Sequence, residues 1–301
     1  MVAFFLWYYE NGDIMNQELT QNDFGPEDTY RLYRTVYEII HPTISKKNIS
    51  NYKIMMQDNF IPLRIFYPKK ISKIEKVIIY IHGKKWITNS TKTYSEVCTN
   101  IVNELDILVI ALDYELKDKA CYNEIVKKCF ETIDYLYKGL KRVGIKSENI
   151  IAIADSVGAS ILTNIITSAK ESLVKKQILL YPVLDLSLSN KESYPSLERK
   201  NQLDETTIKH LKKFRDIYVD KKTYKSPLQE KKYKNWPSTL IITGDLDPVR
   251  DEGIELFKRL FKENKKTQNL NIKFASHGFL NDKDTETLEE CFKEIKSFIN
   301  N

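Results

Sequence analysis

The alternation of short apolar runs with longer segments of helical period, from about residue 76 onward, is the feature that most constrains the fold of this chain. Helical period fills the intervals near 92–104, 122–140, 157–170, 249–264 and 284–299. Strands this continuously apolar require cover on both faces, which the crossover helices of a parallel sheet supply. The sequence therefore predicts an α/β fold with a mostly parallel sheet, whose strands lie in the β-branched runs 76–82, 106–112, 149–154, 177–181, 238–244 and 270–276.

Two further runs between residues 51 and 68 predict a hairpin of antiparallel edge strands, which brings the sheet to about eight strands. Residues 1–48 and 185–235 interrupt the rhythm, because they lack a regular strand signal and are rich in charge and aromatics. Part of the second segment, 205–219, is amphipathic. We expect residues 49–184 and 236–301 to form one catalytic core, with the two interruptions folding together as a helical cap over the carboxyl ends of the strands.

Charge and cysteine content narrow the functional classes. The formal net charge is only +6, and the lysine pairs are scattered among acidic residues, so no nucleic-acid partner is expected. Four cysteines show neither CxxC spacing nor the density of a disulfide-stapled secreted domain. We therefore expect reduced thiols in a cytoplasmic protein, without a zinc site.

The apolar run VAFFLWYY, residues 2–9, is too short to span a membrane and is followed at once by Glu10, so stable membrane insertion is not expected. Large apolar residues usually seek a core, which favours a helix or arm packed on the domain. The alternative is a flap that touches lipid or lines an acyl pocket.

Ser156 is the candidate nucleophile. The predicted strand 149–154 leads into Asp155-Ser156-Val157-Gly158-Ala159 and then into a helix, and a serine on such a sharp turn projects its hydroxyl above the sheet. By itself the pattern is weak, because a serine at a helix start is more often an N-cap. Two further residues favour the nucleophile over the N-cap. Asp247 and His277 each follow a later predicted strand, in the chain order that a Ser-Asp-His triad on this scaffold requires.

These residues resemble the hormone-sensitive-lipase-like branch of the α/β hydrolase esterases (α/β hydrolase fold-3). The family's Gly-Asp-Ser-Ala-Gly-Gly motif is similar to residues 154–159, with Ala154 in the first place. Its remaining motifs are similar to YPVLD at 181–185, SPL at 226–228, DPVRDEG at 247–253 and HGF at 277–279. The resemblance spans roughly residue 60 to the C-terminus. It implies an α/β hydrolase fold, the triad named above and a cap built from an N-terminal segment and an insertion.

The oxyanion loop departs from the family. Its His-Gly-Gly-Gly motif appears here as His82-Gly83-Lys84-Lys85, and we expect backbone N–H groups of Gly83, Lys84 and Val157 to receive the oxyanion. Lysine has the required N–H but lacks the conformational freedom of glycine. One interpretation is a slow or narrow esterase; the other is a positively charged pocket mouth that favours acidic esters. His82 is expected to be a structural hydrogen-bonding residue rather than a second base.

The expected activity is hydrolysis of small or medium acyl esters by a serine carboxylesterase, through an acyl-enzyme and without a metal or organic cofactor. An amidase or deacetylase using the same triad is an alternative, as is a catalytically weak ligand-binding homologue. The expected partner is a small-molecule ester, and a homodimer is compatible with the sequence.

Overall fold

The computed structural model of the protein describes residues 4–10, 13–19, 27–42, 51–54, 60–69, 73–83, 91–114, 122–169, 172–187, 195–198, 202–220, 222–263, 265–281 and 284–301. Its centre is an eight-stranded sheet with the order β10-β9-β8-β7-β5-β6-β4-β3. Within it, β4 runs opposite to the other seven strands. The strands are β3 (Asn51–Ile54), β4 (Leu63–Phe66), β5 (Val77–Ile81), β6 (Leu108–Leu112), β7 (Ile150–Asp155), β8 (Lys176–Leu180), β9 (Ser238–Gly244) and β10 (Thr267–Ile272).

The continuous apolar strands are buried on both faces, as expected for a parallel sheet between helices. In β5, Val77, Ile79 and Ile81 join one core, whereas Ile78 and Tyr80 join the other. All five side chains of this strand have no exposed surface. The predicted α/β class and the hairpin of β3 and β4 are confirmed.

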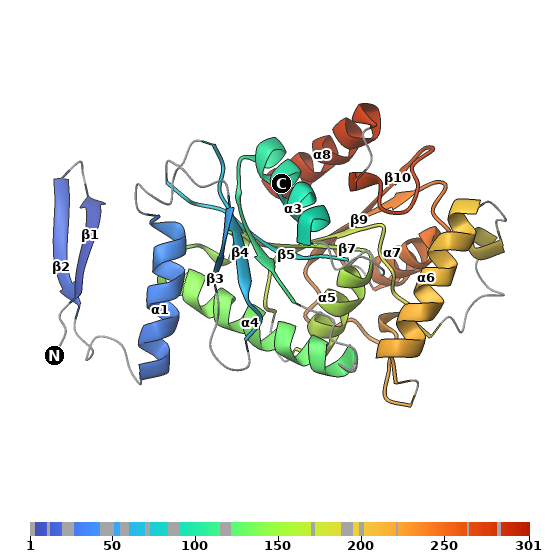
Figure 1. The fold of residues 1–301 in the computed structure, drawn as a ribbon, viewed down its shortest axis with the longest axis horizontal. Helices are drawn as coiled ribbons and strands as arrows, with labels where there is room; N and C mark the ends of the chain where they lie inside the picture. The colour runs from blue at the N-terminus through green and yellow to red at the C-terminus, as the bar shows by residue number, and fades with distance from the viewer. Residues whose placement is uncertain are drawn as a thin grey trace.

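Helices cover both faces of the sheet, as Figure 1 shows, with α3 and α8 above it and α4 and α5 below. The first core packs α4, α5 and α7 on one face, and the second packs α3 and α8 on the other. Each of these helices begins and ends close to its predicted limits: α3 (Thr91–Leu105), α4 (Tyr122–Arg142), α5 (Val157–Ser168), α7 (Arg250–Lys262) and α8 (Thr285–Asn300).

The last strand differs most from the prediction. β10 ends at Ile272 rather than 276, because Lys273 and Phe274 form a turn in which Phe274 has a φ of 60°. It also begins earlier, at Thr267. As an edge strand it is half solvent-facing, so its polar first residues carry no apolar signal.

The two segments expected to fold together as a cap are apart in their described portions. Helix α1 (Glu27–Ile40) buries Val36 and Ile39 against the core beside α4, and the Tyr67 hydroxyl donates to the Ile39 carbonyl at 2.7 Å. Helix α6 (Gln202–Tyr218) lies at the opposite end of the molecule, near α7 (Figure 1). The apolar face of α1 is therefore buried at the β3–β4 end of the sheet.

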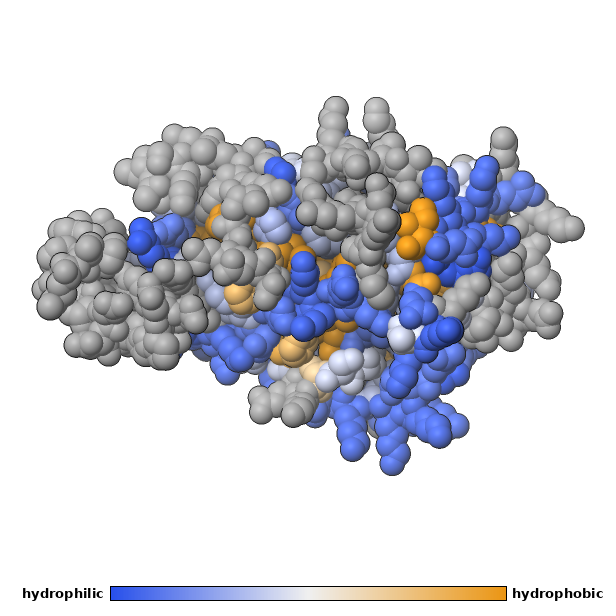
Figure 2. Space-filling view, turned by 60° about the horizontal axis from the view of Figure 1, so that its bottom comes forward, coloured by the Kyte–Doolittle hydropathy of each residue, from blue (hydrophilic) through white to orange (hydrophobic). Residues whose placement is uncertain are grey.

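The described part of the apolar N-terminal run, from Phe4, forms a strand. β1 (Phe4–Glu10) pairs antiparallel with β2 (Asp13–Leu19) in a separate two-stranded sheet, which Figure 1 shows beyond α1. Among the helices that the structure describes, none combines the length and apolar content needed to cross a membrane. Hydrophilic residues cover much of the described surface on the face in Figure 2, with smaller apolar areas between them.

Candidate active site

Ser156 lies in the turn between β7 and α5 with φ 50° and ψ −123°, a conformation that side-chain-bearing residues rarely adopt. Such a backbone costs about 1–3 kcal/mol and requires a surrounding structure that enforces it. Here the Ser156 N–H donates to the Leu180 carbonyl at 3.0 Å, and the Ser156 carbonyl accepts from Ala159 at 3.1 Å and Val183 at 3.0 Å. The hydroxyl makes no capping bond to α5, so Ser156 does not use its side chain as an ordinary N-cap.

Close packing at the turn explains the small residues around Ser156. A Cβ on Gly158 would lie 2.2 Å from the Ile81 carbonyl oxygen, and a Cβ on Gly83 would lie 2.5 Å from the Ser156 Cβ. Both distances are too short for real atoms, so neither glycine can be replaced without movement. Ala154, in contrast, is fully buried in β7, and its methyl group is accommodated there.

His277 connects the serine to a buried acid. Its Nε2 lies 2.9 Å from the Ser156 Oγ, and its Nδ1 lies 2.8 Å from Asp247 Oδ2. The Asp247 side chain is fully buried, and its other oxygen accepts from the Val249 N–H at 2.9 Å. The Tyr181 ring meets the imidazole edge to face, with 5.3 Å between centroids. The structure thus brings together Ser156, His277 and Asp247, with the hydrogen-bond order that a nucleophile, base and orienting acid require.

Two adjacent loops hold His277 beside Asp247. After β9 and β10, the Asp245 N–H donates to the Ile272 carbonyl at 2.8 Å, and the Leu246 N–H donates to the Ala275 carbonyl at 2.9 Å. A Cβ on Gly244 would lie 2.4 Å from that same Ala275 oxygen. Gly244 therefore permits the close approach of the loop that carries the histidine, a role not predicted from the sequence.

The pKa of His277 is raised above its ordinary value. Burial lowers the pKa, but attraction to the Asp247 carboxylate, and the hydrogen bond to it, outweigh that effect. A base with a raised pKa binds its proton more tightly, which suits a group that must take a proton from a hydroxyl.

The expected oxyanion residues divide into three cases. The Gly83 N–H donates to Asp155 Oδ1 at 2.6 Å, and its role in receiving an oxyanion stays a prediction. Lys84, like Lys85, lies outside the described residues. Val157 is the first residue of α5, and its N–H lies at the helix N-terminus, where the first backbone donors have no partner within the helix.

Asp155 instead holds the start of the oxyanion loop. Its Oδ1 accepts from the Tyr80 hydroxyl and the Gly83 N–H, both at 2.6 Å. Burial raises the pKa of this carboxyl to about 6, against the opposing effect of those hydrogen bonds. The acid in the second place of the serine motif was the available sequence signal for this role.

His82 has a structural environment. Its ring is fully buried between Tyr94 and Tyr114, with centroid distances of 4.4 and 4.3 Å and nearly parallel planes. Its backbone carbonyl accepts from the Tyr114 hydroxyl at 2.5 Å. The ring is therefore sandwiched beneath the loop rather than placed beside Ser156.

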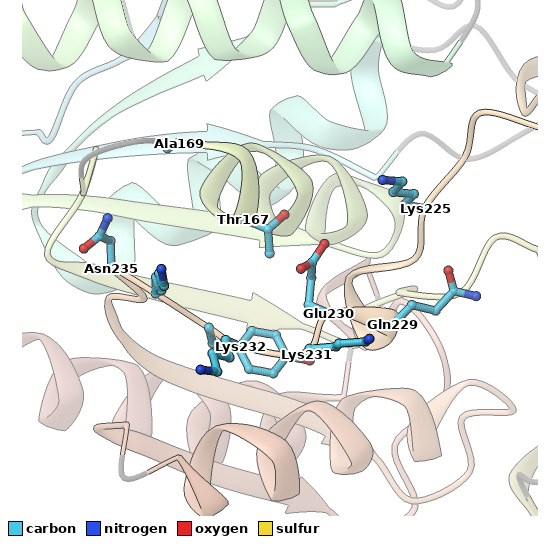
Figure 3. Close-up of a pocket in the computed structure, with 10 residues that line it drawn as sticks. Thr167, Ala169, Lys225, Gln229, Glu230, Lys231, Lys232 and Asn235 are labelled. Carbon is cyan, nitrogen blue, oxygen red and sulfur yellow. The ribbon is translucent and has the colours of Figure 1, made fainter.

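A hollow of about 790 Å³ lies elsewhere, between the end of α5 and the chain that precedes β9 (Figure 3). Its lining contains none of the residues of the candidate active site. The hollow lies next to Thr167 and Ala169 at the end of α5, and four of its lining residues are lysines. The basic lining residues are Lys225, Lys231, Lys232 and Lys234.

Comparison with known proteins agrees with this geometry. Residues 78–281 match the family described as α/β hydrolase fold. A putative α/β hydrolase of Acanthamoeba polyphaga mimivirus is 25% identical over 84% of this chain and 78% of its own length. An arylesterase of Saccharolobus solfataricus is 24% identical over 86% of each chain. The structure of a hyperthermophilic esterase from Pyrobaculum calidifontis superposes with a TM-score of 0.72 at 21% identity, over 90% of this chain and 91% of the other.

The family match covers more than half of the sequence and includes the serine, the acid and the histidine. The chain therefore belongs to the α/β hydrolase fold family, and it is a hydrolase. The predicted resemblance to this family is confirmed.

Replacing Gly158 by Ala should destabilise the protein by about 1–3 kcal/mol, because the new methyl group would overlap the Ile81 carbonyl and push the start of α5 away from β5. Urea unfolding and ester hydrolysis by the same preparation measure both effects. Ser168→Ala is the control, since Ser168 is the exposed last residue of the same helix. Wild-type stability and activity in Gly158→Ala would contradict the packing described here.

The acidic limb of the kcat/KM profile should have its midpoint above the ordinary histidine value of about 6.5. The free imidazole is the active form, so a raised pKa means that activity is lost at a higher pH as the solution is acidified. In Asp247→Asn the attraction disappears, burial dominates, and the midpoint should move to lower pH while kcat falls by about 10⁴-fold. Initial rates from about pH 5 to about pH 9 measure both quantities. If the midpoint of the acidic limb is the same in Asp247→Asn and the wild type, the group that titrates there is not His277.

Proposed function

We propose that this hydrolase is a serine carboxylesterase acting on small or medium acyl esters. The observation that carries the proposal is the hydrogen-bonded series from Ser156 through His277 to the buried Asp247. The serine sits at a strained strand-to-helix turn, where its hydroxyl is directed away from the helix and toward the imidazole. The arylesterase similarity supports ester substrates over other acyl compounds.

In the proposed reaction, Ser156 Oγ attacks the ester carbonyl carbon while His277 Nε2 accepts the hydroxyl proton. Asp247 holds the imidazole in the required tautomer and stabilises its protonated form. The tetrahedral oxyanion would be received by the Val157 N–H and by backbone donors that follow Gly83. The alcohol then leaves with the proton from His277. Water, activated by the same imidazole, attacks the acyl-enzyme, and the carboxylic acid departs.

The proposal includes a cap formed by segment 185–235. In this segment, α6 buries Leu211 and Phe214 in the core. The short helix η4 (Pro195–Glu198) contacts the chain that follows Asp247. The Ser196 hydroxyl donates to the Pro248 carbonyl at 2.9 Å, and the Ser196 N–H donates to Asp251 at 2.8 Å. Contacts so close to Asp247 support a role for this segment in enclosing the substrate.

The direct test compares hydrolysis of p-nitrophenyl acetate, butyrate and octanoate by the wild type and by Ser156→Ala. Loss of the hydroxyl should lower kcat by at least about 10⁴-fold, since removal of such a nucleophile eliminates the covalent route. The acyl-length profile then measures the size of the pocket. p-Nitroacetanilide in the same panel tests the amidase alternative, which faster anilide hydrolysis would favour.

Ser160→Ala is the matched control, because Ser160 lies on the same helix and its hydroxyl bonds Tyr122 instead of His277. It should retain activity within about tenfold of the wild type even if its stability falls by about 1 kcal/mol. Equal ester hydrolysis by Ser156→Ala and the wild type, in cooperatively melting protein, would overturn the proposed function.

A further inference from the structure

Residues 181–185, which follow β8, contact both Ser156 and His277. The Tyr181 ring packs against His277, and the Val183 N–H donates to the Ser156 carbonyl. The next two N–H groups, those of Leu184 and Asp185, donate to a single acceptor, Glu252 Oε2, at 2.5 and 2.9 Å. We refer to residues 181–185 as the post-β8 segment.

Glu252 lies in the first turn of α7, the helix that begins just after Asp247. Its side chain is 1% exposed, which is unusual for a glutamate, since no ion pair joins it to a cation among the described residues. Its own N–H donates to the Val249 carbonyl at 3.1 Å, and the Val249 N–H donates to Asp247. Two hydrogen bonds through Val249 therefore connect the backbone of Glu252 to the carboxyl of Asp247.

The C-terminal part of segment 185–235 also binds the post-β8 segment, at Leu184. The Leu184 carbonyl accepts from the Ser226 hydroxyl at 2.9 Å and from the Tyr224 hydroxyl at 3.1 Å. The Leu186 N–H in turn donates to Tyr224 at 3.0 Å. The post-β8 segment is thus fixed on one side to the returning chain, and only Glu252 fixes its Leu184 and Asp185 N–H groups to α7 among the described contacts.

We propose that Glu252 is a positioning residue of the reaction: by binding the post-β8 segment to the first turn of α7, it sets the spacing between Ser156 on one side and Asp247 with His277 on the other. This inference rests on the proposed esterase function and assigns a residue that does not touch the substrate. Without the acceptor, two buried N–H groups would be left unsatisfied, and the post-β8 segment would move relative to Asp247. Displacements of about 1 Å in such constellations can cost about 100-fold in rate.

The protonation state of Glu252 decides which substitution preserves its hydrogen bonds. Burial raises the pKa of this carboxyl to about 8, against the lowering effect of the two N–H donors, and the negative charges of Asp185 and Asp247 add to the increase. At neutral pH the group is therefore mostly protonated and uncharged. Glutamine has the same size and charge and keeps a carbonyl oxygen to accept both N–H groups, whereas methionine fills the space without an acceptor.

The experiment compares Glu252→Gln and Glu252→Met with the wild type in kcat and KM for p-nitrophenyl acetate at pH 7. Glu252→Gln should stay within about threefold in kcat, while Glu252→Met should lose at least about tenfold in kcat with KM changed less than about threefold. The split is expected because the acceptor aligns the reacting groups and does not contact the ester. Equal kcat in the two variants, or a loss confined to KM, would overturn the inference.

Glu255→Met is the matched control on the same helix, because the Glu255 carboxylate binds only Arg259, at 2.6 Å, among the described contacts. It should leave kcat unchanged. If Glu252→Met does not fold, Glu252→Asp serves as the milder variant. Its carboxyl is one methylene shorter, and kcat should again fall by at least about tenfold at unchanged KM; wild-type kcat in Glu252→Asp would contradict the inference.

The test of Glu252 and the test of the esterase function can fail independently of each other. If Ser156→Ala is inactive and Glu252→Met is fully active, the esterase function stands and only the role of Glu252 fails. If Ser156→Ala keeps wild-type activity, the esterase function fails whatever Glu252 does.

Discussion

The structure depends on the strained backbone of Ser156, a residue with a side chain in a conformation that costs about 1–3 kcal/mol. Its surroundings leave no alternative. Gly158 brings the start of α5 into direct contact with the Ile81 carbonyl of β5, and Leu180 and Val183 bind the serine backbone from the next strand and its loop. The buried parallel sheet therefore supplies the rigidity that keeps the hydroxyl pointed at His277.

Three buried acids organise the loops above that sheet, each in a different way. Asp247 accepts from the imidazole and from the start of α7, Asp155 accepts from Tyr80 and the oxyanion loop, and Glu252 accepts from the post-β8 segment. Burying a carboxyl is unfavourable unless hydrogen bonds satisfy it, so each acid is stable only while its loop stays in place. Because moving a loop would leave its buried carboxyl group without hydrogen bonds, the three acids restrict the positions of their loops.

Much of the fold could be predicted from the sequence, because apolar period is a direct consequence of burial. Strands between helices are apolar throughout, whereas β10 at the edge begins with exposed residues, so its first three residues from Thr267 could not be placed by hydrophobicity. The sequence order of Ser156, Asp247 and His277 was also sufficient to nominate them, since parallel strands end at one edge of the sheet.

The remaining features arise from contacts between distant parts of the chain. The acid beside Ser156 does not by itself show which N–H group Asp155 accepts, and nothing local in the sequence shows that Gly244 admits the loop of His277. The pairing of Glu252 with Leu184 likewise joins residues far apart in sequence. Such contacts depend on the packing of whole elements, which periodicity and motif spacing do not specify.

The central claim, that Ser156 is a nucleophile activated by His277, is tested most directly by covalent labelling with an ethyl p-nitrophenyl alkylphosphonate. Attack by the serine oxygen on phosphorus releases p-nitrophenolate and leaves the phosphonyl group on the protein. The account predicts a single adduct, located by mass spectrometry on Ser156, which forms far more slowly in His277→Ala. A cooperatively folded protein that gains no adduct, or gains it on another residue, would contradict the claim.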